Sequence, residues 1–356
     1  MEDEAKWISL AKSLCIPAPI SCLSSGPPGH ICAGSDDGSV RVYDLTTYRV
    51  VTAIQGLGDE VTSVVSLPPR PPSEGMGDVW IACGRQVLMF HLDPTKMIQK
   101  LADAATVVEV LPDEDDVLNE VSLSANKAYL AFGADSGTVG AIDLSSKSVS
   151  VMKSKHSSIC GFVKFIPNRP REIFSGGYDH SLMHFDFMDR KVLGQYAVPA
   201  SSTESGTSLS PPFIMSTAVS PSGVFAAGTA DGRLLVGFGG ERRSGSQSKG
   251  KRSRKWEGLD ESSMISDNLA EGPIIAVTFK DAEHLTLVTL LGNVGQYQLA
   301  RDEVDDGVKL DALGKFKTSV IEKVNTMLLE GDSVVIGGLT KNGKGAIEVW
   351  AAGQGE

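Results

Sequence analysis

The sequence predicts an all-β protein built from seven repeated units, on three observations. A hairpin recurs along the whole chain, and its best copy is residues 33–44 (AGSDDGSVRVYD), where an Asp-Gly pair turns between two short strands. Further short apolar runs give each unit four strands within about 40–60 residues. No window shows a sustained helical spacing of apolar residues. Because one hairpin cannot bury its own apolar face, the repetition implies side-by-side stacking, and four-stranded units match the blades of a β-propeller.

The copies differ in how closely they keep the hairpin pattern. In three of them the glycine that ends the first strand and the closing aspartate lie ten positions apart. The clear copies are residues 33–44, 132–143, 175–186 and 227–238, and the weaker ones are 82–90, 290–297 and 336–350. Short β-branched or aromatic runs precede the hairpins and are expected to form innermost strands. These runs are residues 61–67, 121–123, 160–166, 214–219 and 274–279.

The two ends of the chain are expected to meet in the seventh blade. Only six residues follow Trp350, too few for an outer strand, whereas residues 7–10 (WISL) precede the first unit as a spare strand. Pairing the two ends removes the exposed strand edges that invite aggregation. We therefore predict that residues 1–356 form a single seven-bladed domain closed by its N-terminal strand.

Two stretches have the composition of insertions. Residues 199–212 are rich in serine and proline and are expected to form a loop. Residues 241–262 begin with a run, 242–255, of seven basic and no acidic residues, and are expected to form a disordered loop between blades five and six. That basic loop is open to three interpretations: a solvated connection, a nuclear localisation signal or a nucleic-acid contact.

The Gly-Asp turn followed by an aromatic residue and Asp resembles the repeat of the WD-repeat β-propeller family. Trp350 keeps the characteristic tryptophan, and other residues stand in its place elsewhere, namely Tyr43, Phe90, Ile142, Phe185, Phe238 and Tyr297. The resemblance implies a protein-interaction scaffold and, more specifically, a substrate receptor of a cullin-4 ubiquitin ligase. Such receptors often carry a Trp-Asp-x-Arg box, from which residues 43–46 (YDLT) and 185–188 (FDFM) depart because both lack the arginine.

The residues that would support catalysis are not grouped in this sequence. It contains no phosphate-binding Gly-x-x-x-x-Gly-Lys-Ser/Thr loop, no Gly-x-Ser-x-Gly turn and no His-Glu-x-x-His motif. Asp37 and Asp135 are the residues that tight hairpins require, and His156 is expected to be a structural histidine that bonds a turn aspartate. The five cysteines are scattered and are expected to be buried free thiols. We therefore predict a protein that is not an enzyme and has no cofactor or metal.

Partners are expected to bind one rim, where loops from several blades converge. The candidate rim residues are mainly acidic: Glu60, Asp113, Glu114, Asp115, Asp116, Glu120, Tyr178, Asp179 and Asp231. A net charge of −11 argues against nucleic acid and anionic membranes as partners. The alternative to the ligase receptor is therefore a reader of basic peptides such as histone tails, or a scaffold for chromatin or ribosome assembly. Either function suits the cytoplasm or the nucleus.

Overall fold

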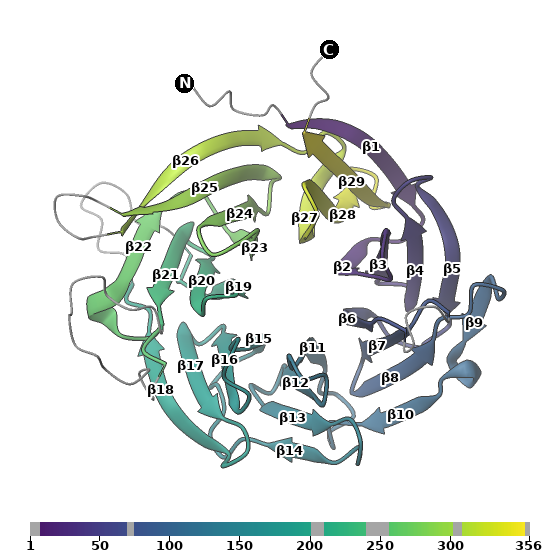
Figure 1. Ribbon diagram of the computed structural model, residues 1–356, viewed down its shortest axis with the longest axis horizontal. Coiled ribbons are helices and arrows are strands. Elements are labelled where there is room, and N and C mark those ends of the chain that lie inside the picture. Colours follow the sequence, from purple (N-terminus) through teal and green to yellow (C-terminus); the bar gives the residue numbers. More distant parts are fainter. Residues whose placement is uncertain (1–7, 70–74, 201–209, 240–255, 302–307, 353–356) are drawn as a thin grey trace.

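The protein is an all-β propeller of seven blades around a central axis (Figure 1). The computed structural model describes residues 8–69, 75–200, 210–239, 256–301 and 308–352. Each blade is an antiparallel sheet whose first strand lies nearest the axis and whose last strand lies on the circumference (Figure 1). Each innermost strand contacts that of the next blade, and the last contacts the first. The prediction of seven blades is confirmed.

The first three blades hold residues 20–151. Blade one contains β2 (Ile20–Ser25), β3 (His30–Ser35), β4 (Ser39–Asp44) and β5 (Arg49–Gln55), with β9 (Ile98–Lys100) added at its outer edge. Blade two contains β6 (Val61–Leu67), β7 (Asp78–Cys83), β8 (Gln86–His91) and β10 (Thr106–Glu109), and a short 3₁₀ helix, η1 (Leu101–Asp103), precedes β10. Blade three contains β11 (Leu118–Leu123), β12 (Tyr129–Ala134), β13 (Val139–Asp143) and β14 (Val149–Val151).

The remaining four blades complete the circle. Blade four contains β15 (Cys160–Phe165), β16 (Glu172–Gly177), β17 (Ser181–Asp186) and β18 (Lys191–Ala197). Blade five contains β19 (Ile214–Val219), β20 (Val224–Thr229), β21 (Arg233–Phe238) and β22 (Met264–Asn268), with the 3₁₀ helix η2 (Glu261–Ser263) before β22. Blade six contains β23 (Ile274–Phe279), β24 (His284–Thr289), β25 (Asn293–Arg301) and β26 (Val308–Lys317). Blade seven contains β27 (Ile321–Glu330), β28 (Ser333–Thr340), β29 (Gly345–Ala352) and β1 (Ile8–Ile16).

Blade seven is completed by the N-terminal strand, as predicted. β1 pairs antiparallel with β29 from Ile8–Ala352 to Ile16–Gly345, with one bulge after Leu10. The strand is longer than the predicted residues 7–10, because its pairing with β29 continues as far as Ile16, which is buried. Joining the two ends of the chain gives β29 a partner on both edges.

The tight turns explain why the same hairpin recurs. Gly38 has a φ of +69°, in the left-handed region that glycine occupies without strain. In blade four the same place is taken by His180, whose φ is +61°. The preceding aspartate of that turn, Asp179, accepts hydrogen bonds from the amide and hydroxyl of Ser181, which hold the turn without a glycine.

Successive blades are joined by polar side chains of the innermost strands. Each donates a hydrogen bond to the first carbonyl of the next innermost strand, over 2.5–3.2 Å. The five bonds are Ser21 to Val61, Thr62 to Leu118, Asn119 to Cys160, Ser216 to Ile274 and Asn325 to Ile20. Two junctions lack the bond: between blades four and five the bulged residue of β15 is Gly161, which has no side chain, and between blades six and seven the bulged residue of β23 is the apolar Ile275. The last of the five bonds links blade seven to blade one and reinforces the closure.

The predicted basic insertion differs from expectation in two ways. It lies inside blade five, between β21 and β22, rather than between blades five and six. Its last part is also packed: Trp256 is 2% exposed, contacts Phe174 and Phe225, and donates its indole N–H to the carbonyl of Gly223 over 2.8 Å. The basic run itself, at 242–255, and most of the predicted loop 199–212 lie outside the described residues.

β9 is an arrangement that the repeat pattern does not predict. It belongs to the connection between β8 and β10 of blade two, yet it pairs parallel with β5 of blade one. The hydroxyl of Thr52, on β5, donates to the carbonyl of Lys96 just before β9. The connection therefore joins blades one and two along the circumference.

Four of the five thiols are buried, and we expect them to be unreactive in the folded protein. Burial raises the pKa of Cys22 and Cys32 to about 12 and that of Cys83 to about 11, and it raises the pKa of Cys160 as well. Cys15, on β1, is exposed. Because the thiolate is the reactive form, Ellman's reagent should modify one thiol in the native protein and all five in denaturant. A second thiol that reacts as fast as the first in the native protein would contradict this packing.

Candidate binding surface around the central cavity

The connections between blades share one face of the propeller with the second turn of each blade. The pairing shows why: Val61, which begins β6, lies opposite Cys83, which ends β7, so the chain enters blade two beside the turn that follows β7. The same register recurs at Leu118 with Ala134 and at Ile214 with Thr229. We call this the connection face. Most of the predicted rim residues belong to it.

A central cavity of about 360 Å³ extends along the axis and is lined by all seven innermost strands. Glu60 lines it just before β6 begins, together with Glu120 on β11 and Tyr178 in the second turn of blade four. Thr217, on β19, lies on the opposite side of the cavity from β6. The cavity is therefore continuous with the acidic loops of the connection face.

Three of the predicted rim carboxylates are already engaged by neighbouring groups on this face. Asp116 is nearly buried and accepts the amide of Ser136 over 2.9 Å. Asp231 pairs with Arg233 over 2.8 Å and is also nearly buried. A carboxylate with these partners stabilises its loop and has little capacity left for an external ligand. The two turn residues named from the sequence are similarly engaged, since Asp37 pairs with Arg41 and Asp135 accepts from Asn119.

Asp179 is the third of these carboxylates, and its partner is His156. The histidine is 1% exposed; its Nδ1 lies 2.9 Å from the carboxylate and its Nε2 lies 2.7 Å from the Ser175 hydroxyl. Burial acts to raise the pKa of Asp179, but the hydrogen bonds from His156, Ser181 and the Ser157 amide outweigh it and lower that pKa. The group fixes the connection into blade four against the second turn of that blade.

Glu120 and Tyr178 lie in the cavity rather than on the rim. Glu120 accepts from the Lys164 ammonium over 2.5 Å and from the Val163 amide over 2.7 Å, so its charge is neutralised between blades three and four. The ring of Tyr178 stacks on that of Phe213, with centroids 5.7 Å apart. A Cβ on Gly161 would lie 3.4 Å from the Tyr178 ring, at ordinary van der Waals distance, so the ring covers Gly161.

The other predicted carboxylates are exposed, and two that the sequence reasoning did not single out join them. Asp59 and Asp36 lie on the connection face beside Glu60, which is itself exposed. We define the acidic sector as the six carboxylates of blades one to three on this face: Asp36, Asp59, Glu60, Asp113, Glu114 and Asp115. Within the described part of the chain, none of the six forms an ion pair. The adjacent acids at 36–37 and 59–60, each next to a predicted strand end, are the signal that could have identified the two missing members.

At the centre of the acidic sector, neighbouring carboxylates repel one another. Partial loss of hydration raises the pKa of Glu60, and the charge of Asp36 raises it further. The pKa of Asp36 is raised by the same loss of hydration and by Asp37. Two arginines of this face are engaged by other acids, since Arg41 pairs with Asp37 and Arg85 pairs with Glu109, each over 3.3 Å. These like charges are therefore left without a neutralising cation of their own.

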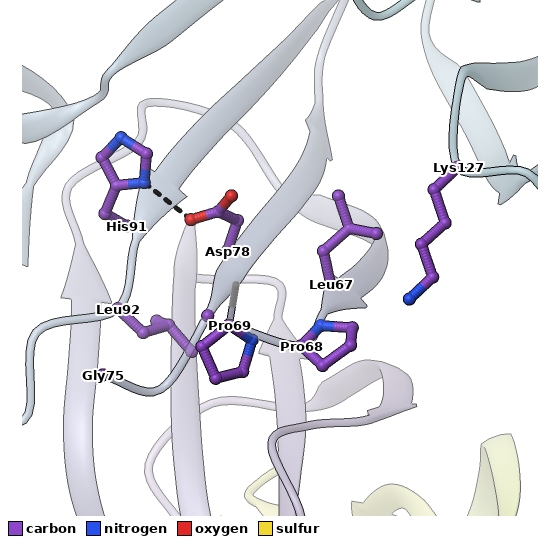
Figure 2. A pocket seen from close by; sticks show the side chains of 9 residues that line it. Leu67, Pro68, Pro69, Gly75, Asp78, His91, Leu92 and Lys127 are labelled. Atoms are coloured by element: carbon purple, nitrogen blue, oxygen red, sulfur yellow. Dashed lines mark hydrogen bonds and ion pairs between the residues drawn. The ribbon is translucent and has the colours of Figure 1, made fainter. Parts of the chain in front are cut away.

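A second cavity, of about 460 Å³, lies at the other face of the propeller, between blades two and three (Figure 2). Leu67, Pro68 and Lys127 line it, and in Figure 2 the ring of His91 points toward Asp78, with Nδ1 and the carboxylate oxygen 2.6 Å apart. Both residues of this pair are substantially exposed. Across the described ranges no three His, Cys, Asp or Glu residues are arranged to hold a metal ion, and no helix could span a membrane.

Comparison with known proteins agrees with this architecture. The family model for the WD domain, G-beta repeat, matches residues 12–44, which contain the first hairpin. The chain is also similar to the WD repeat-containing protein 53 homolog of Dictyostelium discoideum, with 26% identity over 236 residues, or 61% of each protein. The chain thus spans about three fifths of that relative's length. From the sequence alone, residues 156–185 and the acidic run at 113–116 resemble WD repeat-containing protein 53. Seven four-stranded blades and this repeat together support the resemblance to the WD-repeat β-propeller family.

Proposed function

We propose that this propeller is a protein-interaction scaffold whose acidic sector binds Lys/Arg-rich segments of its partners. The observation that carries the proposal is the pair Asp36 and Glu60, two carboxylates with raised pKa values and no ion-pair partner in the described chain. Placing like charges together costs free energy in the unbound protein, and a bound ammonium or guanidinium group would recover it. A rim carboxylate that already has an ion-pair partner, such as Asp231 with Arg233, would recover no such free energy on binding a cation.

The shape of the surface also suits an extended peptide. The acidic sector runs from the second turn of blade one, through the connection at 56–60, to the connection at 110–117, and so crosses three adjacent blades. Several cationic side chains could therefore be engaged at once. Basic histone tails and the basic segments of chromatin or ribosome assembly factors have this chemistry.

The pKa shifts predict how the stability of the folded protein depends on pH. The folded-state pKa values of Asp36 and Glu60 lie above their ordinary values of 3.8 and 4.5. Between the ordinary and the raised values the folded protein binds more protons than the unfolded chain, so the free energy of unfolding falls as the pH rises through that window. At neutral pH both ionised carboxylates therefore oppose folding. Neutralising them should leave the melting temperature unchanged or raise it.

The double variant Asp36→Asn/Glu60→Gln is expected to bind a fluorescein-labelled lysine- and arginine-rich peptide about tenfold more weakly at moderate salt. The wild-type affinity should fall steeply as salt increases, because exposed charges are screened. Fluorescence anisotropy measures both effects. The matched control, Glu257→Gln/Asp332→Asn, removes the same charge from the opposite face and should retain wild-type affinity. Equal weakening in both double variants, or salt-insensitive binding, would contradict a specific acidic sector.

An affinity purification distinguishes this function from that of the ligase receptor that the resemblance implies. Tagged protein is recovered from its own cells at moderate salt, and stoichiometric companions are identified by mass spectrometry. Recovery of a cullin-4 adaptor would support a substrate receptor, despite the missing arginine in residues 43–46 and 185–188. Histones or assembly factors without a ligase subunit would support the basic-segment reader, and their loss from the Asp36→Asn/Glu60→Gln variant would assign them to the acidic sector.

A further inference from the structure

The cavity between blades two and three lies on the face opposite the acidic sector, and the function proposed above does not involve it (Figure 2). Its apolar wall is formed by Leu67, Pro68, Pro69 and Leu92 of blade two, and Lys127 reaches it from the first turn of blade three. The volume of about 460 Å³ lies within the range of roughly 300–1,000 Å³ for pockets that hold small molecules.

The apolar wall of this cavity is rigid. Proline has a fixed φ, so Pro68 and Pro69 restrict the backbone on one side. Gly77, whose φ is +87°, packs so closely against the carbonyl of Leu67 that a Cβ would not fit between them. The carbonyl of Gly77 in turn accepts the amide of Leu92 over 2.9 Å. These contacts fix the two sides of the wall relative to each other, so the cavity is formed before a ligand binds.

The charges that line the cavity do not balance. Asp78 and His91 are paired with each other over 2.6 Å. Lys127 is partly buried, and no acceptor within the described residues pairs with its ammonium group. In Figure 2 its side chain extends toward Leu67 and Pro68 from the side opposite Asp78 and His91. The Lys127 ammonium is therefore the lining charge that lacks a counter-charge in the described chain.

The turn that holds Lys127 does not require a lysine. Its amide donates to the carbonyl of Ser124 over 2.8 Å, and its φ is +58°. Blade five has the same turn with glycine in this place: the amide of Gly223 donates to the carbonyl of Ser220 over 2.9 Å, and its φ is +92°. A left-handed backbone costs free energy for any residue with a Cβ. The conformation of the turn thus favours glycine and gives no reason for the lysine side chain.

These groups together match one chemical class of ligand. A single ammonium attracts one negative charge, and the rigid apolar wall favours hydrocarbon beside that charge. A phosphate group is usually bound by several donors from arginine or backbone N–H groups, whereas Pro68 and Pro69 have no N–H to offer. A carboxylate attached to an apolar chain or ring has one charge next to hydrocarbon, as the cavity requires.

We propose that this cavity binds an apolar group that carries one carboxylate, with the carboxylate at Lys127 and the hydrocarbon against Leu67, Pro68 and Leu92. Two sources have this chemistry: the C-terminal residue of a partner chain and a free carboxylic acid. The cavity and the acidic sector lie on opposite faces and attract opposite charges. The propeller can therefore hold a basic segment on one face and a carboxylate on the other.

Three probes test the ligand class: 3-phenylpropionate, acetyl-leucyl-phenylalanine and the C-terminal amide of that dipeptide. Binding is followed by NMR of protein with labelled leucine methyl groups. The signals of Leu67 and Leu92 should shift saturably with the acids, and the dipeptide amide should bind about tenfold more weakly than the dipeptide acid, as for a lost hydrogen bond to a charged group. The tighter of the two acids identifies the source. Equal binding of the dipeptide acid and its amide, or no saturable shift of either leucine, would overturn the proposal.

The variant Lys127→Gly tests the role of the ammonium. It gives the turn the residue that blade five uses, so the melting temperature should be unchanged or higher, while affinity for the tighter acid should fall about tenfold. The control Lys147→Gly removes the same charge from a left-handed position (φ +61°) between β13 and β14, outside the cavity lining, and should bind the acid like the wild type. Wild-type affinity in Lys127→Gly, or equal weakening in both variants, would overturn the proposal. Neither variant should weaken binding of the basic peptide, so the acidic sector is tested separately.

Discussion

Replacing Glu348 by alanine should destabilise the propeller by about 3–5 kcal/mol, more than any other single substitution considered. Glu348, on β29, is fully buried. Its carboxylate accepts the backbone amides of Ser319, Val320 and Ile321 over 2.6–3.1 Å and the indole N–H of Trp350 over 2.9 Å. The alanine would leave the Ile321 amide and the Trp350 indole N–H buried and unpaired, and would free the amides of Ser319 and Val320.

Chemical denaturation monitored by tryptophan fluorescence measures this loss. Glu348→Gln is the informative control, because its amide keeps one acceptor oxygen and places an N–H donor where the second oxygen stood. Its stability should lie between those of the alanine variant and the wild type. An alanine variant within about 1 kcal/mol of the wild type would mean that water replaces the carboxylate and that these contacts are not needed for the connection into blade seven.

Deleting residues 1–16 should lower the melting temperature by at least about 10 °C, because the deletion removes β1 and opens the propeller. β1 supplies the outer edge of blade seven along the whole length of β29. Without it the backbone of β29 has an unpaired edge, and Trp350, Ile347 and Val349 lose part of their cover. The exposed edge should also promote aggregation on heating. Thermal melts followed by circular dichroism and light scattering test both effects.

A shorter deletion and a peptide separate the strand from its flank. Removing residues 1–7 leaves β1 intact and should have little effect on the melting temperature. A synthetic peptide of residues 8–16 (ISLAKSLCI), added to the truncated protein, should restore part of the lost stability by pairing with β29. An unchanged melting temperature in the protein that lacks residues 1–16 would show that closure by β1 contributes nothing.

The blades could be predicted because they depend on local patterns. Alternating apolar residues, Asp-Gly turns and the regular return of both are written in short stretches, and each stretch folds into the same hairpin wherever it occurs. The strands predicted at 61–67, 214–219 and 274–279 form with those bounds. Closure was also predictable, because a unit short of one strand and a spare strand at the other end have a single simple solution.

The availability of each carboxylate could not be predicted in this way. Asp179 and Glu60 look alike in the sequence, as acids next to a strand end. Asp179 is occupied by His156, which lies 23 residues earlier, whereas Glu60 is left without an ion pair beside Asp36. Hydrogen-bond partners of this kind come from other loops, and their positions depend on how consecutive blades pack.

By itself the sequence determined the repeat, the number of blades, the innermost strands and the closing strand, because each follows from residue spacing within one or two units. The tertiary structure was needed to show which acids of the described chain form no ion pair, and where the basic insertion and β9 fall among the blades. Those features depend on contacts between segments far apart in the chain. The spacing of residues specifies the repeated hairpin. The environment of a side chain depends instead on which residues of other blades and loops pack against it once the propeller has closed.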